Sequence, residues 1–124
     1  MANASVRYMV HDVDAVLPFY IGALGFKLKE RMGPAIAMVT YGDLTLWLSG
    51  PTSSAAQPMP DGRSPVPGGW NRFVIEIDDI QKLYGQLKVA GVPFRNEIIS
   101  GPGGQQVVCE DPSGNPIELF QPRD

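Results

Sequence analysis

Apolar and polar residues alternate along two stretches of the chain, and a helical pattern follows each stretch. In residues 5–10 and 73–77, an apolar residue stands at every second position, so these side chains fall on one face. This pattern predicts two strands. Residues 12–24 and 79–90 carry apolar residues at helical spacing behind an aspartate that can cap the first turn, and a glycine follows each segment. Two helices are therefore predicted. Pro18 is expected to disturb the middle of the first helix, because proline has no N–H to donate.

Both predicted helices are followed by short strands joined by tight turns. The segments concerned are residues 35–41 and 44–49 in the first half and residues 105–110 and 117–121 in the second half. The connections at Gly42-Asp43 and at residues 111–116 contain the residue types that tight turns require. Residues 101–104 include three glycines and are predicted to form a loop. Each half of the chain is thus predicted to be a βαβββ module.

The segment between the two modules differs in composition. Residues 50–69 are rich in Pro, Ser, Gly and Ala and show no periodicity, which predicts an irregular connection that is either an ordered lid or a disordered linker. The chain is of single-domain length, so the two modules must share one core. We expect one domain over residues 1–124, with module one at residues 5–49, a connecting loop at 50–69 and module two at 70–121.

Composition narrows the classes of function. The chain has 124 residues, 44% apolar and 19% charged, with a net charge of −3. No apolar run approaches the roughly 20 residues of a membrane-spanning helix, and the basic residues are scattered, so neither a membrane nor nucleic acid is an expected partner. The single cysteine, Cys109, excludes an internal disulfide and is expected to be inert. The first residues lack the pattern of a signal peptide, so we expect a cytoplasmic protein.

Three segments carry recognisable motifs: residues 10–26, residues 77–79 and, most specifically, the run Asp-Pro-Ser-Gly-Asn-Pro-Ile-Glu-Leu at residues 111–119. In these segments the sequence resembles the vicinal oxygen chelate superfamily. That superfamily contains glyoxalase I, extradiol dioxygenases, fosfomycin-resistance transferases and the bleomycin-resistance binding proteins. The resemblance implies an α+β fold in which two βαβββ modules form a curled mixed sheet around a cleft. It also implies assembly as a homodimer.

Metal-dependent members of the superfamily carry His, Glu or Gln at four positions. The resemblance assigns these positions to Ser5, Trp47, Arg72 and Glu118. A serine hydroxyl is a poor ligand, indole does not bind metal ions, and a guanidinium group repels them. The one remaining carboxylate cannot hold a transition metal against water. We therefore predict no catalytic metal and no cofactor.

The same positions predict a different kind of site. Arg72 and Glu118 are expected to face one cavity as an ion pair, and Trp47 and Trp70 to stack a flat ligand. Strand alternation adds further ligand-binding candidates, namely Arg7, Met9, Met38, Gln106 and Val108. Each candidate also has a structural interpretation, because the indoles could serve as core packing or as a loop anchor and the ion pair could be purely structural.

The interpretation we favour is a binding protein of the bleomycin-resistance type rather than an enzyme. It would sequester an aromatic or polycyclic natural product, such as a bleomycin, mitomycin or enediyne, without turnover. The alternative is a metal-independent lyase, isomerase or dioxygenase-like enzyme that uses Glu118 as general base and Arg72 to stabilise negative charge. A third interpretation is a metal enzyme whose ligands a register slip has hidden, since a one-residue slip moves every side chain to the opposite face.

Overall fold

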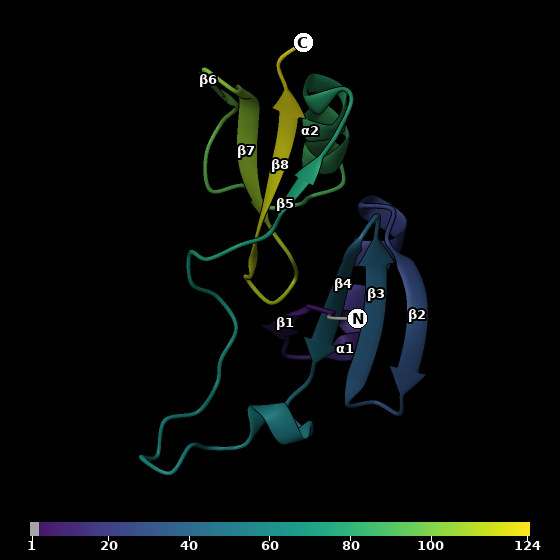
Figure 1. Ribbon diagram of the computed structural model, residues 1–124, viewed down its shortest axis with the longest axis vertical. Coiled ribbons are helices and arrows are strands. Elements are labelled where there is room, and N and C mark those ends of the chain that lie inside the picture. Colours follow the sequence, from purple (N-terminus) through teal and green to yellow (C-terminus); the bar gives the residue numbers. More distant parts are fainter. Residues whose placement is uncertain (1–2) are drawn as a thin grey trace. The chain divides into compact units, whose positions relative to one another are not determined.

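Each half of the chain forms one four-stranded mixed sheet with helical segments packed on one side (Figure 1). The computed structural model describes residues 3–124, and these divide into two compact units, one ending at Gly68 and one running from Gly69 to Asp124. The fold is α+β, and each unit has the predicted βαβββ order. Within residues 3–124, no helix is long and apolar enough to cross a membrane.

The first unit is built from four strands, an α-helix that continues as a π-helix, and a short 3-10 turn. Its elements are β1 (Val6–Met9), α1 (Val13–Leu17), a π-helix (Pro18–Ala23), β2 (Lys27–Met32), β3 (Ile36–Tyr41), β4 (Leu44–Ser49) and a short 3-10 turn (Ser54–Ala56). The strand order is β1-β4-β3-β2, with β1 parallel to β4 and the other pairs antiparallel. Inward-facing side chains of β3 and β4, including Val39, Leu46 and Leu48, are fully buried. These residues form the core of the unit together with Val16, Tyr20 and Phe26.

The second unit repeats this arrangement. Its elements are β5 (Val74–Glu76), α2 (Ile80–Val89), β6 (Ile99–Gly101), β7 (Gly104–Glu110) and β8 (Pro116–Pro122), in the strand order β5-β8-β7-β6. β5 is parallel to β8, and the other pairs are antiparallel. The core residues Ile80 and Leu87 of α2 are buried, as are Val107, Ile117 and Leu119 of the sheet.

The first helix differs from the prediction because of Pro18. The α-helix begins as expected, since Asp12 caps it by accepting a hydrogen bond from the Asp14 N–H at 2.9 Å. Proline cannot donate to the carbonyl four residues earlier, and from Pro18 onward the chain is wound as a π-helix. The Leu24 N–H accordingly bonds to the carbonyl of Phe19, five residues earlier, at 3.0 Å. Gly25 then ends the segment with a positive φ of 87°, as predicted.

The motif at residues 111–119 shapes the β7–β8 connection. The Asp111 carboxylate is buried and accepts hydrogen bonds from the Ser113 N–H at 2.8 Å, the Asn115 N–H at 3.0 Å and the Asn115 side-chain amide at 3.0 Å. These bonds satisfy a buried charge and fix the turn, so the strand that carries Glu118 starts in a defined register with β7.

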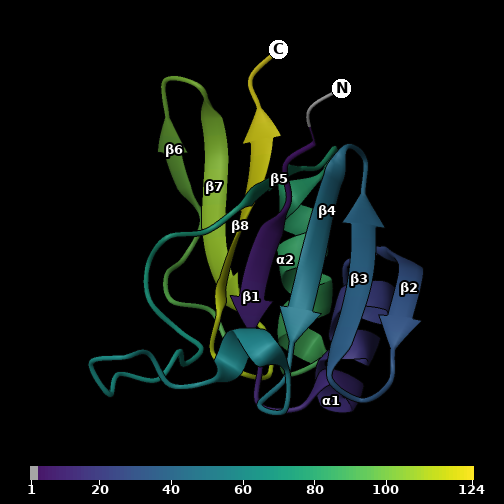
Figure 2. The same cartoon turned by 60° about the horizontal axis from the view of Figure 1, so that its bottom comes forward.

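The predicted loop at residues 101–104 is short, because Gly101 pairs with Gly104 and residues 102–103 form the tight turn of the β6–β7 hairpin (Figure 2). One prediction was wrong in detail. Ala90, which lies in the predicted apolar stripe of the second helix, is exposed as its C-terminal cap. The edge strands β2 and β6 received no bounds from the sequence because most of their residues are exposed and show no alternating pattern.

Candidate functional site

The face of the first sheet opposite its core carries a row of large side chains. Strand register places Arg7 of β1 beside Trp47 of β4, and Trp47 opposite Met38 of β3. Met9 lies in the next row with Ser49 and Ile36. Neighbours in register point to the same face of a sheet. Four predicted ligand-binding residues, Arg7, Met9, Met38 and Trp47, therefore share one face.

Arg7 and Trp47 form a cation–π stack on this face. The Arg7 Cζ atom lies 4.8 Å from the centre of the Trp47 ring, and Nη1 donates a hydrogen bond to the Ser49 hydroxyl at 3.3 Å. Arg7 is exposed, whereas Trp47 is half-buried. One face of the indole is thus covered by a guanidinium group, an interaction of about 0.5–1 kcal/mol at exposed sites.

Arg72 and Glu118 form the expected ion pair in the second unit. Arg72 donates through Nε at 3.0 Å and through Nη2 at 2.8 Å, and both bonds end on the same carboxylate oxygen, Oε1. The Glu118 side chain is only 12% exposed, so its charge is held next to a cation in a partly desolvated place. Arg72 precedes β5, which begins at Val74.

Glu118 is flanked on its own sheet by apolar side chains. Register places Val108 of β7 and Val74 of β5 on either side of it, and Val108 is buried. Gln106 lies one row further along, beside Phe120. The structure thus brings Arg72, Glu118 and Val108 together, with Gln106 next to them.

Trp70 lies in a cluster centred on Arg95, which the sequence did not reveal, and its carbonyl accepts a hydrogen bond from Arg72 Nη1 at 3.2 Å. The guanidinium group of Arg95 lies 4.5 Å from the centre of the Trp70 ring. It also bonds to the Glu110 carboxylate at 2.8 Å and to the carbonyls of Gly69 at 2.6 Å and Gly114 at 3.0 Å. Trp70 is nevertheless 70% exposed, so it keeps open surface away from Arg95.

No sequence signal marked Arg95, because its side-chain partners come from three separate places in the chain: Gly69 with Trp70, Glu110, and Gly114. Arg95 follows an isolated β-bridge between Phe94 and Cys109, and the Arg95 N–H donates to the Val108 carbonyl at 2.9 Å. This pairing aims the side chain at the turn that follows β7. This position could have been predicted only from the pairing of residues 94–95 with β7. Residues 92–96 have no strand pattern that would indicate such a pairing.

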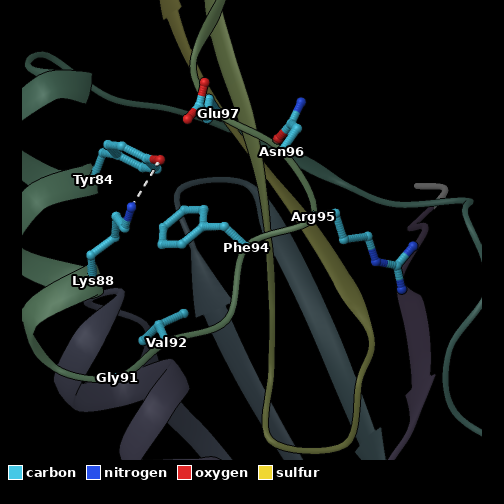
Figure 3. Close-up of a pocket in the computed structure, with 8 residues that line it drawn as sticks. All are labelled: Tyr84, Lys88, Gly91, Val92, Phe94, Arg95, Asn96 and Glu97. Atoms are coloured by element: carbon cyan, nitrogen blue, oxygen red, sulfur yellow. Dashed lines mark hydrogen bonds between the residues drawn. The ribbon is translucent and has the colours of Figure 1, made fainter.

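A cavity of about 430 Å³ lies at the C-terminal end of α2 (Figure 3). Tyr84 and Phe94 meet edge to face at 4.7 Å, and Lys88 lies over the Tyr84 ring at 5.1 Å. The Arg95 side chain points away from this cavity (Figure 3). The cavity is lined by Tyr84, Lys88, Gly91, Val92, Phe94, Arg95, Asn96 and Glu97. None of the predicted ligand-binding residues lines it.

The comparison with known families assigns the chain. The family profile described as Glyoxalase/Bleomycin resistance protein/Dioxygenase superfamily matches residues 4–119. The chain belongs to this superfamily. No curated protein matches the sequence.

Several solved structures resemble this chain over nearly its whole length. One from Sphaerobacter thermophilus is 26% identical with a TM-score of 0.77, and the match covers 98% of this chain and 97% of that one. The antibiotic binding protein TnmS3 from Streptomyces sp. CB03234 is 26% identical with a TM-score of 0.69, covering 99% of each chain. A lactoylglutathione lyase from Agrobacterium tumefaciens is 20% identical with a TM-score of 0.73, covering 97% and 92%, which shows likeness of fold alone.

The residues at the metal-ligand positions of the superfamily do not fit a divalent metal here. Ser5 is exposed ahead of β1, and the Trp47 ring is covered by a guanidinium group. Arg72 is itself a cation and takes up one oxygen of Glu118. Within residues 3–124, no three His, Cys, Asp or Glu side chains lie close enough to hold a metal ion. The four positions therefore supply a hydroxyl group, an indole that is covered by Arg7, and a neutralised charge pair instead of a ligand set.

Cys109 is buried on β7. Burial is the main cause that raises the pKa of its thiol to about 12, and the nearby carboxylates of Asp111 and Glu110 add to the shift. The thiol is therefore protonated at neutral pH and is a poor nucleophile.

Proposed function

We propose that this superfamily member binds an aromatic or polycyclic small molecule and sequesters it unchanged, as a drug-binding resistance protein would. The observation that carries the proposal is the guanidinium–indole contact of Arg7 and Trp47 in the first unit and the Arg72–Glu118 ion pair in the second, which include three of the positions that the resemblance assigns to metal ligands. The likeness to an antibiotic binding protein, at 26% identity over 99% of both chains, supports the same class of function. Bleomycin-, mitomycin- and enediyne-like compounds are the ligands to test first.

The sheet face around Trp47 suits this role. It combines an indole, two thioethers and an exposed guanidinium group, which gives apolar contact area together with a few hydrogen-bond donors. Small-molecule sites have this mixture of apolar surface and sparse polar groups. Sequestration requires affinity and not turnover, so such a face is sufficient for it.

An enzyme that uses Glu118 as base remains the rival proposal. Two donors from Arg72 occupy Oε1, so a substrate proton would have to be taken by the other oxygen of the same carboxylate. The two proposals differ in the fate of the ligand. A bound compound recovered chemically unchanged after prolonged incubation supports sequestration, whereas a product whose formation stops in Glu118→Gln supports catalysis.

Titration calorimetry against a panel of aromatic antibiotics tests the binding proposal. Trp47→Ala and Trp70→Ala each remove one candidate platform, and we expect at least one of them to weaken binding about tenfold or more. Val66→Ala is the matched control, because Val66 is 72% exposed in the connecting segment. Unchanged affinity in both tryptophan variants would contradict the stacking proposal. The predicted homodimer is tested separately by sedimentation velocity.

A further inference from the structure

The arginines of this chain differ in whether an acidic group neutralises them. Four of the six form ion pairs, namely Arg31 with Asp14, Arg63 with Asp61, Arg72 with Glu118 and Arg95 with Glu110. Arg123 donates to a backbone carbonyl near the C-terminus. Arg7 bonds to a hydroxyl group and stacks on an indole, and none of the carboxylates in residues 3–124 pairs with it. The sheet face around Trp47 therefore carries an exposed and unneutralised positive charge.

The surroundings of Arg7 contain few acidic residues. The strands β1, β3 and β4 contain none, as their sequences Val6–Met9, Ile36–Tyr41 and Leu44–Ser49 show. Glu30 of β2 is in register with Met38 and so lies in the same row. It is three strand spacings from Arg7, roughly 14 Å at about 4.8 Å per strand. At that distance through solvent, its charge is largely screened.

The stack also fixes how the guanidinium group can meet a ligand. A guanidinium group is planar and carries five N–H donors around its edge. Its Cζ atom lies 4.8 Å from the centre of the Trp47 ring and Nη1 donates to Ser49, and the side chain is exposed, so further N–H donors remain available to a ligand. Such an edge matches the two oxygens of a carboxylate, or a phenolate oxygen beside a carbonyl.

We infer that the ligand of this site is a planar aromatic anion. Its anionic oxygens accept hydrogen bonds from the edge of Arg7, and its ring lies against the apolar side chains of the same face, Met38 and Trp47. The inference rests on the proposed function and adds the charge of the ligand to it. It also moves ligand recognition from Arg72, whose charge Glu118 already neutralises, to Arg7.

Three probes of one shape test the inference on the full-length protein: 2-naphthoate, 2-naphthamide and 2-naphthylmethylammonium. We expect calorimetry at low ionic strength to show naphthoate binding at least about tenfold more tightly than the amide, with the cation weakest. Arg7→Gln should reduce that preference to about twofold or less, and raising the salt concentration should weaken the preference of the wild-type protein. Arg31→Gln, which removes an ion-paired arginine of the same unit, should leave the preference unchanged.

The outcomes separate the inference from the proposed function. If the three probes bind equally, or if Arg7→Gln keeps the preference for naphthoate, the inference is overturned while aromatic binding stands. If no aromatic probe or antibiotic binds, the proposed function fails and the inference fails with it. Should Arg7→Gln not fold, as judged by circular dichroism, Arg7→Lys takes its place. That variant keeps the charge but lacks the planar edge, so we expect it to retain a salt-sensitive but smaller preference, and a full preference would contradict the edge geometry.

Discussion

Replacing Arg95 by methionine should destabilise the protein far more than replacing another arginine that has the same type of ion pair. The methionine side chain keeps much of the apolar stem but none of the donors. In the wild-type protein, these donors bond to Glu110 at 2.8 Å, Gly69 at 2.6 Å and Gly114 at 3.0 Å. The substitution also removes the cation from beneath Trp70. One change therefore releases three acceptors and an aromatic contact.

The expected loss of stability in Arg95→Met follows from how exposed Arg95 and Glu110 are. The side chain of Arg95 is 16% exposed and that of Glu110 is 30% exposed, so water replaces the lost bonds only in part. Hydrogen bonds to a charged group contribute about 1.5–3 kcal/mol each, but contributions that share one side chain do not add fully. Breaking a fully buried ion pair costs about 3–5 kcal/mol. We expect Arg95→Met to lower the free energy of unfolding by about 2–4 kcal/mol.

Arg63→Met is the matched control. The Arg63–Asp61 pair has a similar distance of 2.7 Å, but the Arg63 side chain is 85% exposed. Loss of such an exposed pair should change stability by no more than about 0.5 kcal/mol. Urea denaturation followed by circular dichroism measures both variants. With a slope of about 2 kcal/mol per M, Arg95→Met should lower the midpoint by roughly 1–2 M. Equal midpoints for the two variants would refute the assignment of Arg95 as a structural centre.

Three further outcomes are expected. Gly104→Ala should destabilise the protein by more than about 2 kcal/mol, because the backbone φ of Gly104 is 150° and the new Cβ would collide with a carbonyl of β8. Gly101→Ala is the control, because its Cβ would meet open space, and it should cost under about 1 kcal/mol. Thermal unfolding of both variants tests this difference. Cys109 should resist a thiol reagent at pH 8 until the protein is unfolded. Stability should fall as pH rises from 9 toward 12, since the thiol ionises first in the unfolded chain, and this fall should be smaller in Cys109→Ala. A double-mutant cycle of Arg72→Met and Glu118→Gln should give a coupling energy of about 1 kcal/mol or more, and a value near zero would show that the pair is not coupled in solution.

The alternation of apolar and polar residues was sufficient to predict the strands other than β2 and β6. Strand alternation selected Arg7, Met9 and Met38, and the register of β1, β3 and β4 places them on one face with Trp47. This worked because a strand has a period of two, so one buried face fixes the direction of every other side chain. The caps and closing glycines of the helices were predictable for the same reason, since they act within a few residues of the backbone groups they satisfy.

Features that depend on tertiary contacts were not predictable. The edge strand β2 has mostly exposed residues, so nothing in its sequence distinguishes it from a loop. The winding change at Pro18 was expected only as a disturbance, because a missing N–H indicates where a helix is perturbed but not which hydrogen-bond pattern replaces it. Arg95 was missed because its acceptors converge from separate parts of the chain.

Both units contain an arginine stacked on a tryptophan, yet the two stacks have different physical roles. Each nitrogen of the Arg95 guanidinium group donates to an acceptor, a carboxylate or one of two carbonyls, so its charge is neutralised inside the fold. The contact with Arg95 also holds the Trp70 ring in the segment that begins the second unit. Arg7 has one hydroxyl partner and an exposed edge, so its charge remains available to a ligand. Removing Arg95 should therefore cost stability first and binding only as a consequence, whereas removing Arg7 should change ligand preference while leaving the unfolding midpoint nearly unchanged. The same contact type thus supports the fold in one unit and supports recognition in the other, and the number of satisfied donors decides which.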